Sequence, residues 1–378
     1  MDLAEHKKRK QNRDTTLYLM VPTAIIAKIV LHLFLPSKYF YDSWRMIDML
    51  NYGKKSTMGW SGYKTAVDIH KSWNVFHFGT VLEFSLFYGL IMTIIMMIIV
   101  SKTKEMNTRE VIFVLMATGV LNIYVFTINK EMIQIVYFLA IYIVICLPIK
   151  NNFIKILGCA GIFYFESLQF RAYYIIMACL VIGIYFIFTW LRKLHSINKI
   201  HIILTVVACF LMVFVFFYLS SFVAKSDYED ALSARDGSVL TVDEVGEGGA
   251  TSAIRNPIEV NGNLGIFMYN YVINSVRMML PIELLIKNPG YFPFVIYQVF
   301  ILLYVFKTLK NIKKLDKRIV VALSCFIAYF LGSVVFEPDF GSWTRHEATT
   351  FPILQMLALS SESEEGKEFE GEIVEYQY

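Results

Sequence analysis

The sequence has few of the residues that usually form metal or redox sites. Its five cysteines all lie inside apolar segments, and none belongs to a CxxC motif or to a cluster of cysteine and histidine. This distribution excludes a zinc site of the usual spacing and is typical of small buried packing residues. No D-x-D motif occurs either, so nothing in the sequence demands a divalent metal.

Charged residues are scarce as well. Only 17% of the 378 residues are charged and 56% are hydrophobic, whereas soluble domains carry charge on about a quarter of their residues. The apolar residues form blocks of roughly twenty, the length at which a helix spans a bilayer. The composition therefore predicts an all-α, polytopic integral membrane helical bundle. Nucleic-acid binding is not expected, because the basic runs are short and lie next to the apolar blocks.

Ten apolar blocks are predicted to cross the membrane. The first is too long for the core of a signal peptide and has no small-residue cleavage site, so we expect it to be retained. A further segment, 263–288, contains Arg277, Pro281 and Glu283, which are costly beside lipid. It is predicted to be re-entrant or interfacial. The predicted spans are about 17–35, 79–100, 111–128, 131–149, 154–170, 172–191, 201–223, 290–306, 319–336 and 348–360.

Lysine and arginine between the spans indicate the orientation, because short cytoplasmic loops carry an excess of both. With ten spans, both termini are cytoplasmic and the loops 36–78 and 224–262 lie outside. Residues 1–360 are predicted to form one transmembrane domain, followed by a disordered acidic cytoplasmic tail, 361–378. The basic clusters expected on the cytoplasmic side are Lys7–Arg13, Lys102/Lys104/Arg109, Lys150/Lys155, Arg192/Lys193/Lys199 and the loop 307–318.

Ionisable residues from separate parts of the chain are predicted to meet on the outer face of the membrane. The richest stretch, FEPDFGSWTRHEATTFP, joins the last two spans. Each residue alone has a structural interpretation, as a helix cap, a local ion pair or a snorkelling side chain. The residues that converge are Asp42, Arg45, Glu166, Arg171, Arg277, Glu337, Asp339, Arg345 and His346.

The arginines of this set favour a more specific interpretation. A planar guanidinium stays charged and matches two phosphate oxygens, so arginines at membrane level suit a lipid-linked diphosphate. They would also stabilise the charge that develops on a departing diphosphate. The attacking hydroxyl needs a base, and the candidates beside Arg345 are His346, Glu337 and Asp339. Candidate substrate ligands are Arg45, Arg171, Arg235, Arg255, Arg277, Asp42 and Glu166, with no metal or cofactor.

Three segments, together with the layout of the spans and the enlarged late outer loop, resemble the Wzy-type polymerases of bacterial capsule and O-antigen synthesis. They are INKEMIQIVYFLAIYIV (128–144), YFESLQFRAYYIIM (164–177) and EPDFGSWTRHEATTFPIL (337–354). The resemblance implies a fold like that of the membrane-embedded GT-C glycosyltransferases. It also implies an inverting glycosyl transfer that joins undecaprenyl-diphosphate-linked repeat units on the outer face of the bacterial cytoplasmic membrane, without a nucleotide sugar.

The resemblance also implies roles for individual residues. Family arginines hold diphosphate and sugar, which gives that role to Arg171, Arg277 and Arg345, and in the loop to Arg235 and Arg255. The related O-antigen ligases use a histidine close to the acceptor, and His346 is the comparable residue. The 224–262 loop is acidic, whereas the functional loops of the family are often basic. Expected partners are the lipid-linked oligosaccharide, the bilayer, a flippase and a chain-length regulator.

Other functions are compatible with the same composition. A flippase or transporter of lipid-linked oligosaccharides would also use arginines in the membrane, although no convincing internal repeat is found. A membrane acyltransferase acting on glycans would place an arginine and a histidine near the first span, whereas FYDSWRMIDML has an arginine and no histidine. A non-enzymatic component of envelope assembly is the remaining alternative.

Overall fold

The computed structural model describes residues 3–36, 40–53, 61–170, 174–223, 225, 228–233 and 252–360. Every regular element within these residues is a helix, as predicted. Seven helices in this part of the chain are long and apolar enough to cross a membrane. The protein is therefore a polytopic helical membrane protein. The seven are Ala4–Phe34, Val81–Ser101, Thr108–Val125, Tyr174–Lys193, Lys199–Val223, Pro289–Lys310 and Lys317–Phe336.

The other three predicted spans form shorter or more polar helices. α6 (Lys130–Cys146) has 17 residues and α16 (Phe351–Ala358) has 8. α7 (Asn152–Gln169) is longer, but it includes Lys155 and Glu166. Because of these lengths and charges, the count of ten spans stays a prediction. The GT-C-like arrangement of the helices stays a prediction as well.

The segment predicted to be re-entrant or interfacial is interrupted. It contains α11 (Leu264–Met279) and the short α12 (Ile282–Lys287). Pro281 lies between them and has no backbone N–H to continue the hydrogen bonding of α11, which favours a break at this point. The interruption fits a segment that is not a simple span, and its position relative to the membrane stays a prediction.

The chain divides into two compact units. Three helices contribute residues to both units: α6, α7 and α15 (Phe340–Ala348). The division therefore does not follow consecutive domains, and the single domain predicted over 1–360 stays a prediction. Unit 1 consists of Met1–Tyr142, Phe165–Ala172 and Arg345–Leu359, and unit 2 consists of Ile143–Tyr164, Tyr173–Thr344 and Ser360–Tyr378.

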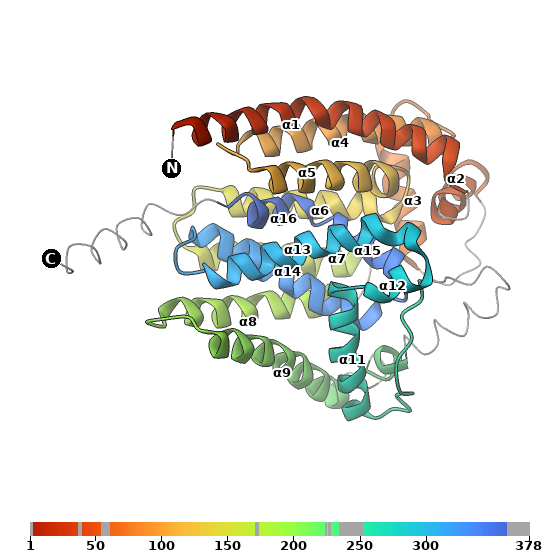
Figure 1. Ribbon diagram of the computed structural model, residues 1–378. Helices are drawn as coiled ribbons and strands as arrows, with labels where there is room; N and C mark the ends of the chain where they lie inside the picture. The colour runs from red at the N-terminus through yellow and green to blue at the C-terminus, as the bar shows by residue number, and fades with distance from the viewer. Residues whose placement is uncertain are drawn as a thin grey trace. The chain divides into compact units, whose positions relative to one another are not determined.

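Three long helices form the body of unit 1 and run side by side (Figure 1). α4 (Val81–Ser101) runs opposite to the other two and buries one apolar face against α1. Both of the others end in a π-helical turn, in which each hydrogen bond spans one residue more than in an α-helix. They are α1 (Leu3–Ile29) with η1 (Val30–Phe34), and α5 (Thr108–Val120) with η3 (Leu121–Val125).

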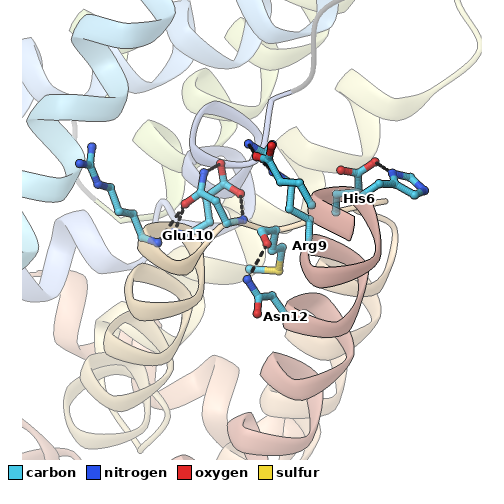
Figure 2. Close-up of polar contacts among 9 residues, drawn as sticks. His6, Arg9, Asn12 and Glu110 are labelled. Carbon is cyan, nitrogen blue, oxygen red and sulfur yellow. Dashed lines mark hydrogen bonds and ion pairs between the residues drawn. The ribbon is translucent and has the colours of Figure 1, made fainter. Parts of the chain in front are cut away.

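At one end of unit 1, polar contacts join the start of α1 to the loop after α4, two basic segments that were expected on a common side (Figure 2). Asn12 Nδ2 donates to the Met106 carbonyl at 3.1 Å, and His6 Nδ1 lies 2.6 Å from Glu105 Oε1. These contacts hold the basic loop 102–109, between α4 and α5, beside the basic start of α1. We call this the basic end of unit 1.

Unit 2 also has an end at which basic turns lie side by side. α8 (Tyr174–Lys193) packs against α9 (Lys199–Val223) and α14 (Lys317–Phe336). Lys313 Nζ donates to the carbonyls of Leu194 and His195 at 2.6 and 2.7 Å. The loop 307–318, which follows α13 (Phe292–Lys310), therefore lies beside the turn between α8 and α9. In each unit, basic turns that are distant in sequence share one end, as the distribution of lysine and arginine predicts.

Candidate functional site

The candidate site lies at the end of unit 1 opposite its basic end. Two helices occupy this end within the predicted outer loop 36–78: α2 (Tyr41–Tyr52) and α3 (Ser61–Trp73). Sequence reasoning missed both. The signal was present in α3, because its buried residues recur at helical spacing. They are Tyr63, Ala66, Val67 and His70.

His346 and Glu131 form the centre of the site. His346 Nε2 lies 3.3 Å from Glu131 Oε1, and the two side chains are 5% and 1% exposed. The charges of Arg345 and Lys130 also act on the Glu131 carboxylate. Burial of a carboxylate is costly unless nearby charges and hydrogen bonds compensate, and these three groups provide that compensation. We call Lys130, Glu131, Arg345 and His346 the Glu131 cluster.

The carboxylate determines which ring nitrogen of His346 can act as a base. A carboxylate only accepts hydrogen bonds, so neutral His346 presents Nε2–H to Glu131 and keeps the lone pair on Nδ1. The carboxylate also stabilises the imidazolium that forms when Nδ1 takes a proton. This is the division of roles between carboxylate and histidine in many hydrolytic and transfer enzymes.

The start of α6 places Lys130 and Glu131. Asn129 Oδ1 accepts the N–H of Met132 at 2.8 Å, which is the geometry of a helix N-cap. Both charged residues therefore lie in the first turn of α6. The partial positive charge of a helix N-terminus stabilises a carboxylate at this position.

Asp42 on α2 connects the cluster to α3. Its Oδ2 lies 3.8 Å from Lys130 Nζ, and its Oδ1 accepts the hydroxyl of Tyr63. The ammonium of Lys130 lies 4.0 Å from the centre of the Tyr63 ring. Burial and the neighbouring Asp42 carboxylate raise the pKa of Tyr63, so its hydroxyl stays protonated and continues to donate.

Arg45, on α2, is a second cation beside the Tyr63 ring, in addition to Lys130 on α6. Its guanidinium lies 4.6 Å from the centre of the Tyr41 ring and 5.2 Å from that of Tyr63, and Nη2 donates to the Tyr41 hydroxyl at 2.9 Å. Two predicted substrate ligands, Asp42 and Arg45, thus lie on the helix that contacts Lys130. A third, Glu166, is buried in the α7 part of unit 1, where its charge reaches Tyr137 of α6.

Arg277 and Arg255 belong to unit 2. The Arg277 guanidinium forms a bidentate pair with Glu283, with N–O distances of 2.9 and 2.7 Å. Its Nη1 donates to the Arg255 carbonyl at 2.7 Å and to Asn274 Oδ1 at 2.8 Å. Because Glu283 neutralises the charge, the geometry favours a structural role that joins α11, α12 and the segment before them. Substrate binding by Arg277 and Arg255 stays a prediction.

Asp339 and Glu337 also belong to unit 2. Asp339 Oδ1 accepts the Ser342 N–H at 2.8 Å and thereby caps the start of α15. Glu337 is buried where α14 ends. The carboxylate that the structure places against His346 is Glu131, and the proposed roles of Asp339 and Glu337 as bases stay predictions.

Two other predicted ligands, Arg171 and Arg235, lie outside the described residues. Within the described part of the chain, no group of three or more histidine, cysteine, aspartate and glutamate side chains is placed to hold a metal ion. Comparison with protein-family models, with curated proteins and with solved structures found no match to this chain.

Sequence reasoning did not single out Lys130 or Glu131. Both residues stand in the segment INKEMIQIV, where a charged pair follows an asparagine and precedes an apolar block. This pattern is typical of the start of a helix. It shows the cap, but it does not identify His346 as the partner of Glu131.

Proposed function

We propose that the protein polymerises polyprenyl-diphosphate-linked oligosaccharide repeat units, as its resemblance to Wzy-type polymerases suggests. It would act on the outer face of the bacterial cytoplasmic membrane. The observation that carries the proposal is the buried pair of His346 and Glu131, with Arg345 and Lys130 acting on the same carboxylate. A base and two cations are the groups that glycosyl transfer from a lipid diphosphate requires.

The proposed reaction assigns a part to each member of the Glu131 cluster. His346 Nδ1 takes the proton of the acceptor sugar hydroxyl, while Glu131 stabilises the imidazolium. The acceptor oxygen forms the new bond to the anomeric carbon of the donor as the bond to the diphosphate breaks. Arg345 and Lys130 stabilise the negative charge on the departing polyprenyl diphosphate. The low exposure of the cluster strengthens these interactions, because little water screens them.

Reconstitution of the purified protein in lipid nanodiscs tests the proposal. With a lipid-diphosphate-linked oligosaccharide as the only substrate, we expect chains of two or more repeat units and release of free polyprenyl diphosphate. Arg345→Lys should lower the rate by at least about 100-fold, because a single ammonium cannot make the bidentate contact with phosphate.

Arg9→Lys is the matched control, since Arg9 makes an exposed pair with Glu5 at the basic end. It should polymerise at the wild-type rate. Movement of intact lipid-linked units across a vesicle membrane, without chain growth, would instead identify a flippase. Consumption of an acyl donor would identify an acyltransferase.

The orientation of unit 1 gives a second prediction. In a variant without the five native cysteines, Ser72→Cys should react with a membrane-impermeant thiol reagent added to intact cells. Lys104→Cys should react only after the membrane is permeabilised, because both positions are exposed but belong to opposite ends of unit 1. The opposite pattern would place the Glu131 cluster on the cytoplasmic side, away from the outer-face substrate.

A further inference from the structure

A short stretch of buried, non-helical backbone precedes α6. Residues Phe126–Asn129 connect η3 to α6, and all four are buried. Buried backbone outside a helix leaves N–H and C=O groups that need partners, particularly at membrane depth where water is scarce. The groups that satisfy these atoms therefore determine where α6 begins, and with it where Glu131 lies.

Lys28, in the last turn of α1, donates to one carbonyl of this stretch and to one carbonyl of η3. Its Nζ donates to the carbonyls of Asn122 and Phe126 at 2.7 and 2.8 Å, and the side chain is buried. Asn122 belongs to η3, the π-helical end of α5. The last carbonyls of a helix carry its partial negative charge, so the ammonium of Lys28 caps α5 from a neighbouring helix.

Gly89 on α4 makes room for this contact. A Cβ atom at position 89 would overlap Lys28 Cε and would lie 3.1 Å from Lys28 Nζ. Because of this overlap, any side chain at position 89 displaces the end of the lysine. The close approach of the two helices at Gly89 is thus part of the same arrangement.

His70 and Asn129 hold the other end of the stretch. His70 Nε2 lies 2.8 Å from the Asn129 carbonyl, and Nδ1 lies 2.8 Å from the Tyr88 hydroxyl. A carbonyl only accepts, so Nε2 carries the hydrogen and Nδ1 accepts from Tyr88. Asn129 Nδ2 donates to the Tyr124 carbonyl at 2.7 Å, while its Oδ1 caps α6.

We propose that Lys28 is a positioning residue for the Glu131 cluster. It fixes the carbonyls at the end of α5, and the stretch Phe126–Asn129 transmits that position to Lys130 and Glu131 at the start of α6. This inference rests on the proposed function. Two features, both common at functional sites, support a role beyond stability. Lys28 is an ionisable residue within a candidate membrane-spanning helix, and its partner Asn122 lies in a π-helical turn.

Two substitutions disturb the lysine by independent routes. Lys28→Met keeps the length and the apolar packing of the side chain but cannot donate to the two carbonyls. Gly89→Ala leaves Lys28 in the sequence and forces it away. Gly119→Ala on α5 is the matched control, because its Cβ would meet only Thr23 Cγ2, at 4.0 Å.

Hydrogen exchange and kinetics measured on the purified, folded protein test the proposal. Lys28→Met and Gly89→Ala should both increase amide exchange in residues 126–132. Both should lower kcat by about 100-fold, because a small displacement of a catalytic group is enough for such a loss. KM for the lipid-linked substrate should change little. Gly119→Ala should match the wild type in both measurements.

The two readouts separate this inference from the proposed function. Unchanged exchange in residues 126–132 for Lys28→Met would overturn the positioning role, whatever the activity. Increased exchange in a protein whose wild type makes no polymer would support the positioning of α6 and reject the polymerase. Increased exchange with an unchanged kcat would show that Lys28 stabilises the fold without positioning Glu131, which also overturns the inference.

Discussion

Glu131→Gln is expected to lower the rate of polymer formation by about 10²- to 10⁴-fold while the protein still folds. Glutamine has nearly the same shape as glutamate, so the start of α6 should be preserved. It has no negative charge, however, so it can neither stabilise the protonated form of His346 nor compensate the nearby cations. His346→Gln should cause a comparable loss, because it removes the base itself.

The chain provides a matched pair of controls for this experiment. His6 and Glu105 form a second histidine–glutamate contact, at 2.6 Å, at the basic end of unit 1 (Figure 2). His6→Gln and Glu105→Gln remove the same functional groups from an exposed position. Both variants should retain the wild-type rate, measured as released polyprenyl diphosphate per mole of folded protein in nanodiscs.

A double variant that combines Glu131→Gln with His346→Gln tests whether these two residues act together. If Glu131 acts through His346, the double variant should be no slower than the slower single variant, because groups that act as a unit are not additive. A Glu131→Gln protein that polymerises at the wild-type rate would remove Glu131 from the mechanism. The base would then be His346 acting without this carboxylate, or one of the other two candidates from the sequence, Glu337 and Asp339.

Stability should fall in acid because His70 is buried in its neutral form. Burial lowers the pKa of His70 from 6.5 to about 4, although its hydrogen bond to the Asn129 carbonyl opposes the shift. Between these two values, the unfolded chain binds a proton that the folded chain does not. The contribution of His70 is therefore fully present above about pH 6.5 and is lost as the pH falls, by about 3 kcal/mol near pH 4.

The comparison of wild type with His70→Gln isolates this effect. Glutamine can donate to the Asn129 carbonyl and accept from Tyr88, but it does not titrate. The unfolding free energy of both proteins is measured in detergent near neutral pH and at about pH 5. Between these two conditions, it should fall more for the wild type than for His70→Gln. Equal slopes would mean that His70 takes up a proton in the folded state, so its nitrogens could not have the assigned roles.

Much of the helical framework could be predicted from the sequence. The predicted blocks 79–100, 201–223 and 319–336 agree within a few residues with α4, α9 and α14. Such blocks are readable because lipid requires a continuous apolar run long enough to cross, which is a local property of the chain. The helices α2 and α3 were missed because they are amphipathic and lack such a run.

The candidate site could be predicted only in part. His346 and Arg345 stood out because ionisable residues between apolar blocks are unusual. Arg277 stood out for the same reason, yet Glu283 neutralises its charge. A sequence shows that an arginine is present, but whether its charge remains available depends on its partner in the folded chain. Glu131 shows the converse, because it becomes a candidate only when the folded chain places His346 against it.

The sequence by itself determined that this chain crosses a membrane many times and which turns share its basic ends. Hydropathy and the placement of lysine and arginine act through short segments, so they need no knowledge of the fold. The tertiary structure decided which buried charges meet: Glu131 with His346, and Lys28 with the carbonyls that end α5. Those pairings join residues far apart in the chain, and only the packing of helices brings such groups within hydrogen-bonding distance.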